Sequence, residues 1–237
     1  MWAAMNIKLL DKLVKNGNCF DKMNCVDLKY GLDVLVHEEG FGIREYIASK
    51  GYCLDILVND TSMDVRREVA KQGYGLNILV HDEEPAVRIE VARHGYGLDI
   101  LINDTDPRAL VEVARQGYGL DKLVNDKSWV VRAVVAQQGY SLDTLIHDSS
   151  AGVRKAVAKQ GYGLNILIHD KDARVRESVA DQGYGLNVLM NDENFLVRMA
   201  VAKQRYGLDV LINDEDGYVR AYALENMDIS TRMKTNS

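Results

Sequence analysis

Two charged residues recur along the chain at intervals of 22 residues, and carboxylates in such a row could carry acid–base or metal chemistry. The acids are Glu38, Asp60, Asp82, Asp104, Asp126, Asp148, Asp170, Asp192 and Asp214. Six residues after such an acid an arginine follows, at Arg44, Arg66, Arg88, Arg132, Arg154, Arg176, Arg198 and Arg220. A catalytic site needs one constellation unlike its surroundings, whereas this pair is repeated almost unchanged. We therefore expect a structural ladder of charge-assisted bonds, within or between neighbouring repeats.

Four of the five histidines also share one position, directly before the acid, where other repeats carry Asn: His37, His81, His147 and His169. Neighbouring packed helices lie ~8–10 Å apart, too far for two imidazoles on successive repeats to share a zinc ion at ~2 Å. We expect Asn and His to bond the turn backbone, and we predict no metal site. The fifth, His94, replaces a Gln at a predicted helix end.

Cysteines and sequence motifs give no sign of a cofactor or an active site. Cys19, Cys25 and Cys53 form a sparse, odd set without C-x-x-C spacing, which favours a reducing compartment and a cytoplasmic location. Cys19 and Cys25 are expected as buried residues of an end cap. We find no motif for phosphate binding, a serine nucleophile or a metalloprotease. The sequence therefore predicts a protein that is not an enzyme.

Composition excludes two classes of partner. The net charge of −6 and pI near 5.4 argue against direct binding of a nucleic-acid backbone. No apolar run approaches the ~18–20 residues of a membrane span.

The elements that position these residues follow from the 22-residue repeat itself. We number the 22 positions of each repeat as columns and start from the glycine of segments such as GYGLNILVHD, which begins at Gly73. Leu fills columns 4 and 7 and an aliphatic residue fills column 8, which predicts a short helix of about two turns. Apolar residues at columns 15, 19 and 20 predict a second helix of ~10 residues. Neither apolar stripe folds alone, so the repeats must stack into a solenoid.

Residues typical of helix ends stand at the predicted boundaries of the short and the long helix. Pro85 and Pro107 stand in column 13, where a first helical residue tolerates proline. Column 12 offers Ser62, Asp106 and Ser128 as N-caps. The column 1 glycine predicts a left-handed helix end, followed by a tyrosine that packs back onto column 19. The column 3 glycine predicts a tight turn into the next short helix.

Ten repeats can be counted, from 7–28 to 205–226. We expect residues 1–28 to form a degenerate N-terminal capping repeat, 29–226 a solenoid of nine repeats, and 227–237 a tail. The predicted fold is all-α, a right-handed α-solenoid of about ten two-helix repeats.

The repeat resembles two known families. DEEPAVRIEVA from Asp82 and DARVRESVA from Asp172 resemble the second helix of HEAT-like repeats. VRKAVAKQGYGLNILI from Val153 is closer to the leucine-rich repeat variant family, whose units alternate an α-helix with a short 3₁₀-type helix. Some members hold an iron–sulfur cluster on four cysteines. We do not expect this cluster here, because this chain offers only three cysteines at unsuitable spacing. Leu110 departs from the pattern by replacing the arginine, and Arg205 by replacing the column 1 glycine.

Function is expected to reside in the columns that vary, 11 to 14, 17 and 18. Columns 13 and 14 hold large apolar pairs, Trp129–Val130 and Phe195–Leu196, where neighbouring repeats have small or charged residues, and column 14 adds Tyr218. If exposed, these are anchors for a partner; the alternative is that they fill gaps between repeats. Column 18 holds Glu68, Glu90 and Glu112 in successive repeats, either a solvated face or an acidic stripe for a basic partner.

These observations favour a non-enzymatic solenoid that binds another protein, as a scaffold or inhibitor. One alternative is an inhibitor, encoded by a phage or mobile element, of a nucleic-acid-handling enzyme such as a defence nuclease, acting through its acidic surface. Another is a HEAT-like enzyme of the lyase or glycosylase type. A third is self-association through the end repeats, where Val219, Tyr222 and Leu224 lie in the last one.

Overall fold

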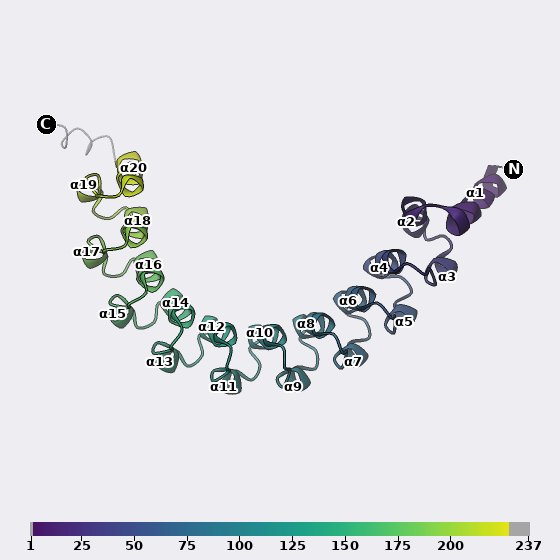
Figure 1. Cartoon of the computed structure of the whole chain (residues 1–237), viewed down its shortest axis with the longest axis horizontal. Helices are drawn as coiled ribbons and strands as arrows, with labels where there is room; N and C mark the ends of the chain where they lie inside the picture. The colour runs from purple at the N-terminus through teal and green to yellow at the C-terminus, as the bar shows by residue number, and fades with distance from the viewer. Residues whose placement is uncertain (1, 228–237) are drawn as a thin grey trace. The chain divides into compact units, whose positions relative to one another are not determined.

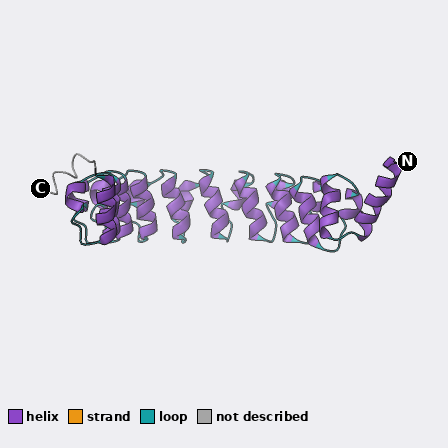
Figure 2. Cartoon of the chain, turned by 90° about the horizontal axis from the view of Figure 1, so that it is seen from above, coloured by secondary structure: helices purple, strands orange, loops and turns teal. Residues whose placement is uncertain are grey.

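The computed structural model describes residues 2–227, with side chains from Ile7 onward. These residues form 20 α-helices and no strand (Figures 1 and 2). The first two helices are α1 (Trp2–Asn16) and α2 (Cys19–Asp27). After them, a short helix of four residues alternates with a long helix of nine or ten. The predicted all-α solenoid of repeats is confirmed.

The chain divides into two compact units at Tyr118 and Gly119, and each is described by itself. Unit 1 continues with the short helices α3 (Leu32–Leu35), α5 (Leu54–Leu57), α7 (Leu76–Leu79) and α9 (Leu98–Leu101). Its long helices are α4 (Phe41–Ser49), α6 (Met63–Lys71), α8 (Pro85–Arg93) and α10 (Pro107–Arg115).

Unit 2 repeats the same alternation. Its short helices are α11 (Leu120–Leu123), α13 (Leu142–Leu145), α15 (Leu164–Leu167), α17 (Leu186–Leu189) and α19 (Leu208–Leu211). Its long helices are α12 (Trp129–Gln137), α14 (Ala151–Lys159), α16 (Ala173–Asp181), α18 (Phe195–Lys203) and α20 (Gly217–Asn226). Within each unit, every long helix packs on the next long helix. In Figure 1 the long helices line the inner side of each unit's curve and the short helices line the outer side.

The short helix is one α-turn extended by tighter bonds. In α5, the Leu57 amide bonds the Cys53 carbonyl, while Asp60 N bonds Leu57 O in the i→i+3 manner at the far end. The residue before each short helix is left-handed, and it is a glycine at all of them except Cys53 and Ser141, for example Gly97 at φ +60°. A Cβ there would lie 2.6 Å from Val80 Cγ2 of the preceding repeat. Conformation and space therefore both favour glycine in column 3 at positions such as Gly97.

The long helix buries the predicted stripe and ends as predicted. Val65, Val69 and Ala70 are fully buried in α6, at columns 15, 19 and 20. Gly73 is left-handed at φ +73°, and the Tyr74 amide bonds Val69 O. This is the Schellman pattern that satisfies the last carbonyls of a helix. Pro85 and Pro107 are first helical residues, as expected.

Two N-cap predictions need correction. Asp106 accepts a hydrogen bond from the Arg108 amide, but Ser62 and Ser128 stand at the N-cap position without a side-chain cap bond. The column 10 aspartate receives the amide of the column 12 residue whether or not that residue caps the helix, as it does at Ser62, Ser128 and Asp106.

The first repeat differs from the others more than its degenerate sequence suggests. In place of a four-residue helix it has the 15-residue α1. Cys25 and Val26 occupy columns 19 and 20 and are fully buried, but Cys19 is exposed, contrary to expectation. Of the predicted tail, residues 228–237 lie outside the described residues.

Candidate protein-binding surface

The repeated Arg and Asp join successive repeats. Arg66 Nε donates to Asp82 Oδ2 over 2.6 Å, and Arg66 Nη2 donates to Oδ1 over 3.0 Å. The third nitrogen, Nη1, donates to the Asp60 carbonyl of the same repeat over 2.8 Å. Each arginine therefore bonds the backbone at the acid of its own repeat and the carboxylate of the next. The same forked pair forms in Arg44–Asp60, Arg88–Asp104, Arg132–Asp148, Arg154–Asp170, Arg176–Asp192 and Arg198–Asp214.

Electrostatics of this ladder favour the charged forms. Burial alone would raise the pKa of Asp170, but hydrogen bonds from Arg154 and the Asp172 amide outweigh it and lower the pKa. The hydrogen bond to Asp170 raises the pKa of Arg154. The ladder begins with Lys22 Nζ, 2.7 Å from Glu38 Oε2. Both partners are engaged in each of these pairs, so the pairs hold successive repeats together and contain no free catalytic carboxylate; Leu110 replaces the arginine of one repeat.

A second ladder, which the sequence analysis missed, runs along the other ends of the long helices. Gln116 Nε2 donates to the Arg93 carbonyl of the preceding repeat over 3.0 Å. Gln72, Gln160 and Gln204 make the same bond. His94 takes over this role, with Nε2 3.1 Å from the Lys71 carbonyl. The recurrence of Gln in column 22 was the available signal.

The column 9 histidines do not have the expected turn role. His37, His81, His147 and His169 are exposed, and their imidazoles make no hydrogen bond to the described residues. His147 and His169 line an open cavity of about 400 Å³ with Asp148 and Asp170, whose carboxylates are already held by Arg132 and Arg154. Over the described side chains, no group of three or more His, Cys, Asp or Glu could hold a metal ion.

The glutamate stripe of unit 1 is covered, which corrects the interpretation as a solvated face. Glu90 and Glu112 are only 8% and 7% exposed. Arg93 Nη1 lies 2.7 Å from Glu90 and its Nε lies 3.4 Å from Glu112. Arg115 pairs with Glu112 at 2.8 Å, and Lys71 pairs with Glu68 at 2.5 Å. The groups that reach solvent along this stripe are therefore the cations of column 21.

The apolar residues named from the sequence are exposed on the long helices of unit 2. Trp129 is 51% exposed, and Val130 beside it is also exposed. One edge of the Trp129 ring covers Gly152 in the next long helix, where a Cβ would lie 2.5 Å from Trp129 Cζ3. Trp129 thus fills a gap between repeats with part of its ring and exposes the rest to solvent.

A second apolar group lies toward the end of the same unit. Phe195 is 39% exposed, Tyr218 is 77% exposed, and Leu196 is exposed between them in sequence. Phe195 also lines an open cavity of about 340 Å³ with Arg198, Glu215 and Asp216. In column 13, the long helices before and after those of Trp129 and Phe195 in the sequence have Pro107, Ala151, Ala173 and Gly217, whereas Phe41 and Met63 are exposed in the same column of unit 1.

Comparison with known proteins did not place this chain in a family. No protein-family model matches the chain, and no curated protein matches it. No helix among the described residues combines the length and apolar character needed to cross a membrane. The regular spacing and stacking of the helices identify the chain as a helical-repeat protein.

Proposed function

We propose that this chain is a non-enzymatic binding solenoid, a scaffold or inhibitor that captures another protein through the apolar groups of unit 2. The observation that carries the proposal is the exposure of Trp129, at 51%, on a long helix. Aromatic side chains of this kind dominate binding hot spots, because they bury a large area at little cost in conformational entropy. Exposed apolar residues also line the short helices, for example Ile166 and Val188, but those on the long helices of unit 2 include the aromatic side chains of Trp129, Phe195 and Tyr218.

The proposal extends to the family of the repeat and to the cellular location of the protein. We propose that the repeat is related to the leucine-rich repeat variant family, since its short helix ends in i→i+3 bonds of the 3₁₀ type. All three cysteines are free thiols, which supports a cytoplasmic location. The inhibitor with an acidic surface loses one of its two supports, because Glu90 and Glu112 are buried and paired, while the net charge of −6 still allows it.

The test compares two double variants of the full chain as bait in a lysate of the source or host cell. The first, Trp129→Ala with Phe195→Ala, removes one anchor from each apolar group. The matched control, Ile166→Ala with Val188→Ala, removes two equally exposed apolar side chains from the row of short helices. We expect the control to retain a stoichiometric partner and the first variant to lose it.

Melting curves separate binding from folding. The first variant should melt within a few degrees of the wild type, because Trp129 and Phe195 are 51% and 39% exposed and neither is a core residue. Equal capture of the partner by both variants would contradict the proposal. Loss of capture by the control alone would move the binding surface to the short helices.

A further inference from the structure

The short helices of unit 1 carry an uninterrupted row of exposed apolar side chains. These side chains occupy column 6 of four successive repeats and are between 41% and 48% exposed: Val34, Ile56, Ile78 and Ile100. In the first repeat Lys12 takes this column, and in the first two repeats of unit 2 Lys122 and Thr144 take it. The row is therefore a feature of residues 29–116.

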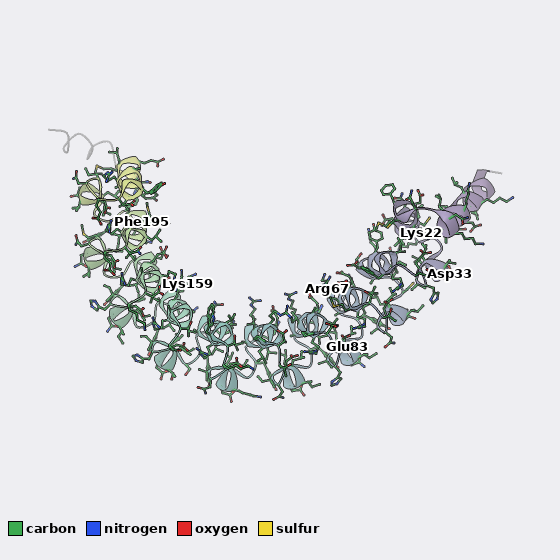
Figure 3. All side chains as sticks on the ribbon, viewed as in Figure 1. Lys22, Asp33, Arg67, Glu83, Lys159 and Phe195 are labelled. Carbon is green, nitrogen blue, oxygen red and sulfur yellow. The ribbon has the colours of Figure 1, made fainter. Side chains whose placement is uncertain are left out.

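The side chains around this row are acidic. We call columns 5, 6, 9 and 11 of these four repeats the outer strip of unit 1, and every residue in it is exposed. The strip contains no Lys or Arg, whereas its acids are Asp33, Glu39, Asp55, Glu83 and Asp99. In Figure 3, Asp33 and Glu83 lie on the outer side of the unit, and Arg67 lies on the inner side.

These acids are not neutralised within the described part of the chain. Four of the five carboxylates, all except that of Glu83, make no ion pair or hydrogen bond with a described residue. Glu83 lies 3.9 Å from Arg66 Nη2, but Arg66 already forms its forked pair with Asp82. Unlike the buried glutamates of column 18, the acids of the outer strip offer their negative charge to a partner.

Between two short helices the outer strip has an open cavity of about 340 Å³, lined by Ile78 together with Asn59 and His81. The amide of Asn59 and the imidazole of His81 make no hydrogen bond with a described residue. Neither residue has the left-handed backbone that would favour asparagine. Both side chains can donate and accept, so they suit the N–H and C=O groups of a peptide backbone.

We infer that the outer strip of unit 1 binds an extended, basic segment of another protein. Apolar side chains of this segment lie against Ile56, Ile78 and Ile100, and its Lys and Arg side chains pair with the acids of the strip. Its backbone N–H and C=O groups bond Asn59 and His81. An α-helix would not use these two residues, because its backbone groups already bond one another.

The length of the row sets the length of the segment. From Val34 to Ile100 the row crosses three helix-to-helix steps of ~8–10 Å each. An extended chain rises ~3.3 Å per residue, so about eight or nine residues span the row. This surface lies on the short helices of unit 1, so the inference goes beyond the proposed function and does not rest on Trp129 or Phe195.

The probe is a phage-displayed library of random 12-residue peptides, selected on the full-length chain. We expect recovered peptides that combine apolar residues with an excess of Lys and Arg over Asp and Glu. A synthetic peptide from that pool should bind about ten-fold more weakly to Asp55→Lys with Asp99→Lys, since two attractive charge pairs become repulsive. Binding should also weaken as salt is raised. Asn59→Ala with His81→Ala keeps the acids and should weaken binding as well, because the backbone contacts are lost.

The matched control is Asp143→Lys with Asp209→Lys, which makes the same charge change on exposed column 5 residues of unit 2 and should leave the affinity unchanged. Trp129→Ala with Phe195→Ala should also bind the peptide as the wild type does. Failure to enrich any peptide, peptides without basic excess, or wild-type affinity for either unit 1 variant would overturn the inference and leave the proposed function standing. Loss of binding only in Trp129→Ala with Phe195→Ala would move the peptide to the long helices of unit 2, which supports the proposed function and also overturns the inference.

Discussion

The guanidinium of Arg154 makes two parallel hydrogen bonds to the carboxylate of Asp170, which belongs to the next repeat. Nε donates to Oδ2 over 2.6 Å, and Nη2 donates to Oδ1 over 2.9 Å. Both side chains are largely buried, and Asp170 Oδ1 also receives the Asp172 amide. The fork fixes the distance and rotation between two stacked repeats, which a single point charge would not do.

Removing the arginine should therefore destabilise the stack. We expect Arg154→Ala to lower the free energy of unfolding by about 3 kcal/mol, because the Asp170 carboxylate is left buried and unpaired. Arg154→Lys keeps the charge but loses the forked pair of hydrogen bonds, so its free energy of unfolding should lie between those of the wild type and Arg154→Ala. Urea denaturation measures the loss. The adjacent control is Lys155→Ala, whose ion pair with Glu177 is long, at 3.9 Å, and which should change stability by less than ~0.5 kcal/mol. Equal effects from Arg154→Ala and Lys155→Ala would show that the ladder is not needed for stacking.

Stability should also fall in acid. The pKa values of Asp60, Asp148 and Asp170 are lowered in the folded chain, since their hydrogen bonds to arginine outweigh the effect of burial. A lowered folded pKa means that the unfolded chain binds more protons in acid. The stabilisation is therefore complete above the unfolded pKa of ~3.9 and is lost as pH falls through the folded values. We expect the urea midpoint to be level near neutrality and to drop below about pH 5. Asp170→Asn should be less stable at neutral pH and show a shallower drop, and a midpoint independent of pH would contradict this account.

Two left-handed positions without glycine offer a stabilising change. Cys53 and Ser141 occupy column 3 at φ 51°, where the other repeats from residue 31 onward carry glycine. A side chain there costs roughly 1 kcal/mol in backbone strain. Ser141→Gly should therefore raise the melting temperature. The opposite change, Gly97→Ala, should lower it, because its Cβ would also approach Val80 within 2.6 Å. A lower melting temperature for Ser141→Gly would show that the serine side chain compensates for the strain.

The contact between Trp129 and Gly152 can be tested by fluorescence. A Cβ at Gly152 would lie 2.5 Å from the ring, so Gly152→Ala must displace Trp129. In a Trp2→Phe background, where Trp129 is the remaining tryptophan, we expect a shifted emission maximum. Gly42 holds the same column in α4, and a Cβ there meets nothing within 4 Å. Gly42→Ala should leave the emission unchanged and add up to ~1 kcal/mol of helix stability. An unchanged spectrum for Gly152→Ala would mean that the ring does not rest on this glycine.

Local structure could be predicted from the sequence because each repeat carries its own helix-end and core signals. Leucines in columns 4 and 7, proline in column 13 and glycine in columns 1 and 3 act within a few residues of themselves. Twenty-two-residue periodicity then required stacking, because neither apolar stripe is wide enough to fold alone. The exposed apolar residues of unit 2 could be picked out in the same way, as departures from a repeated pattern.

Relations between repeats were decided by the tertiary structure. The sequence showed that Arg and Asp recur, but not that Arg154 reaches the acid of the following repeat. It placed Glu90 and Glu112 in a stripe, but column 18 is buried between neighbouring long helices, so these acids pair with Arg93 and Arg115. Whether a side chain such as Trp129 is covered depends on a residue one repeat away, here Gly152. Local signals determine each helix, whereas burial and pairing depend on how one repeat is stacked on the next.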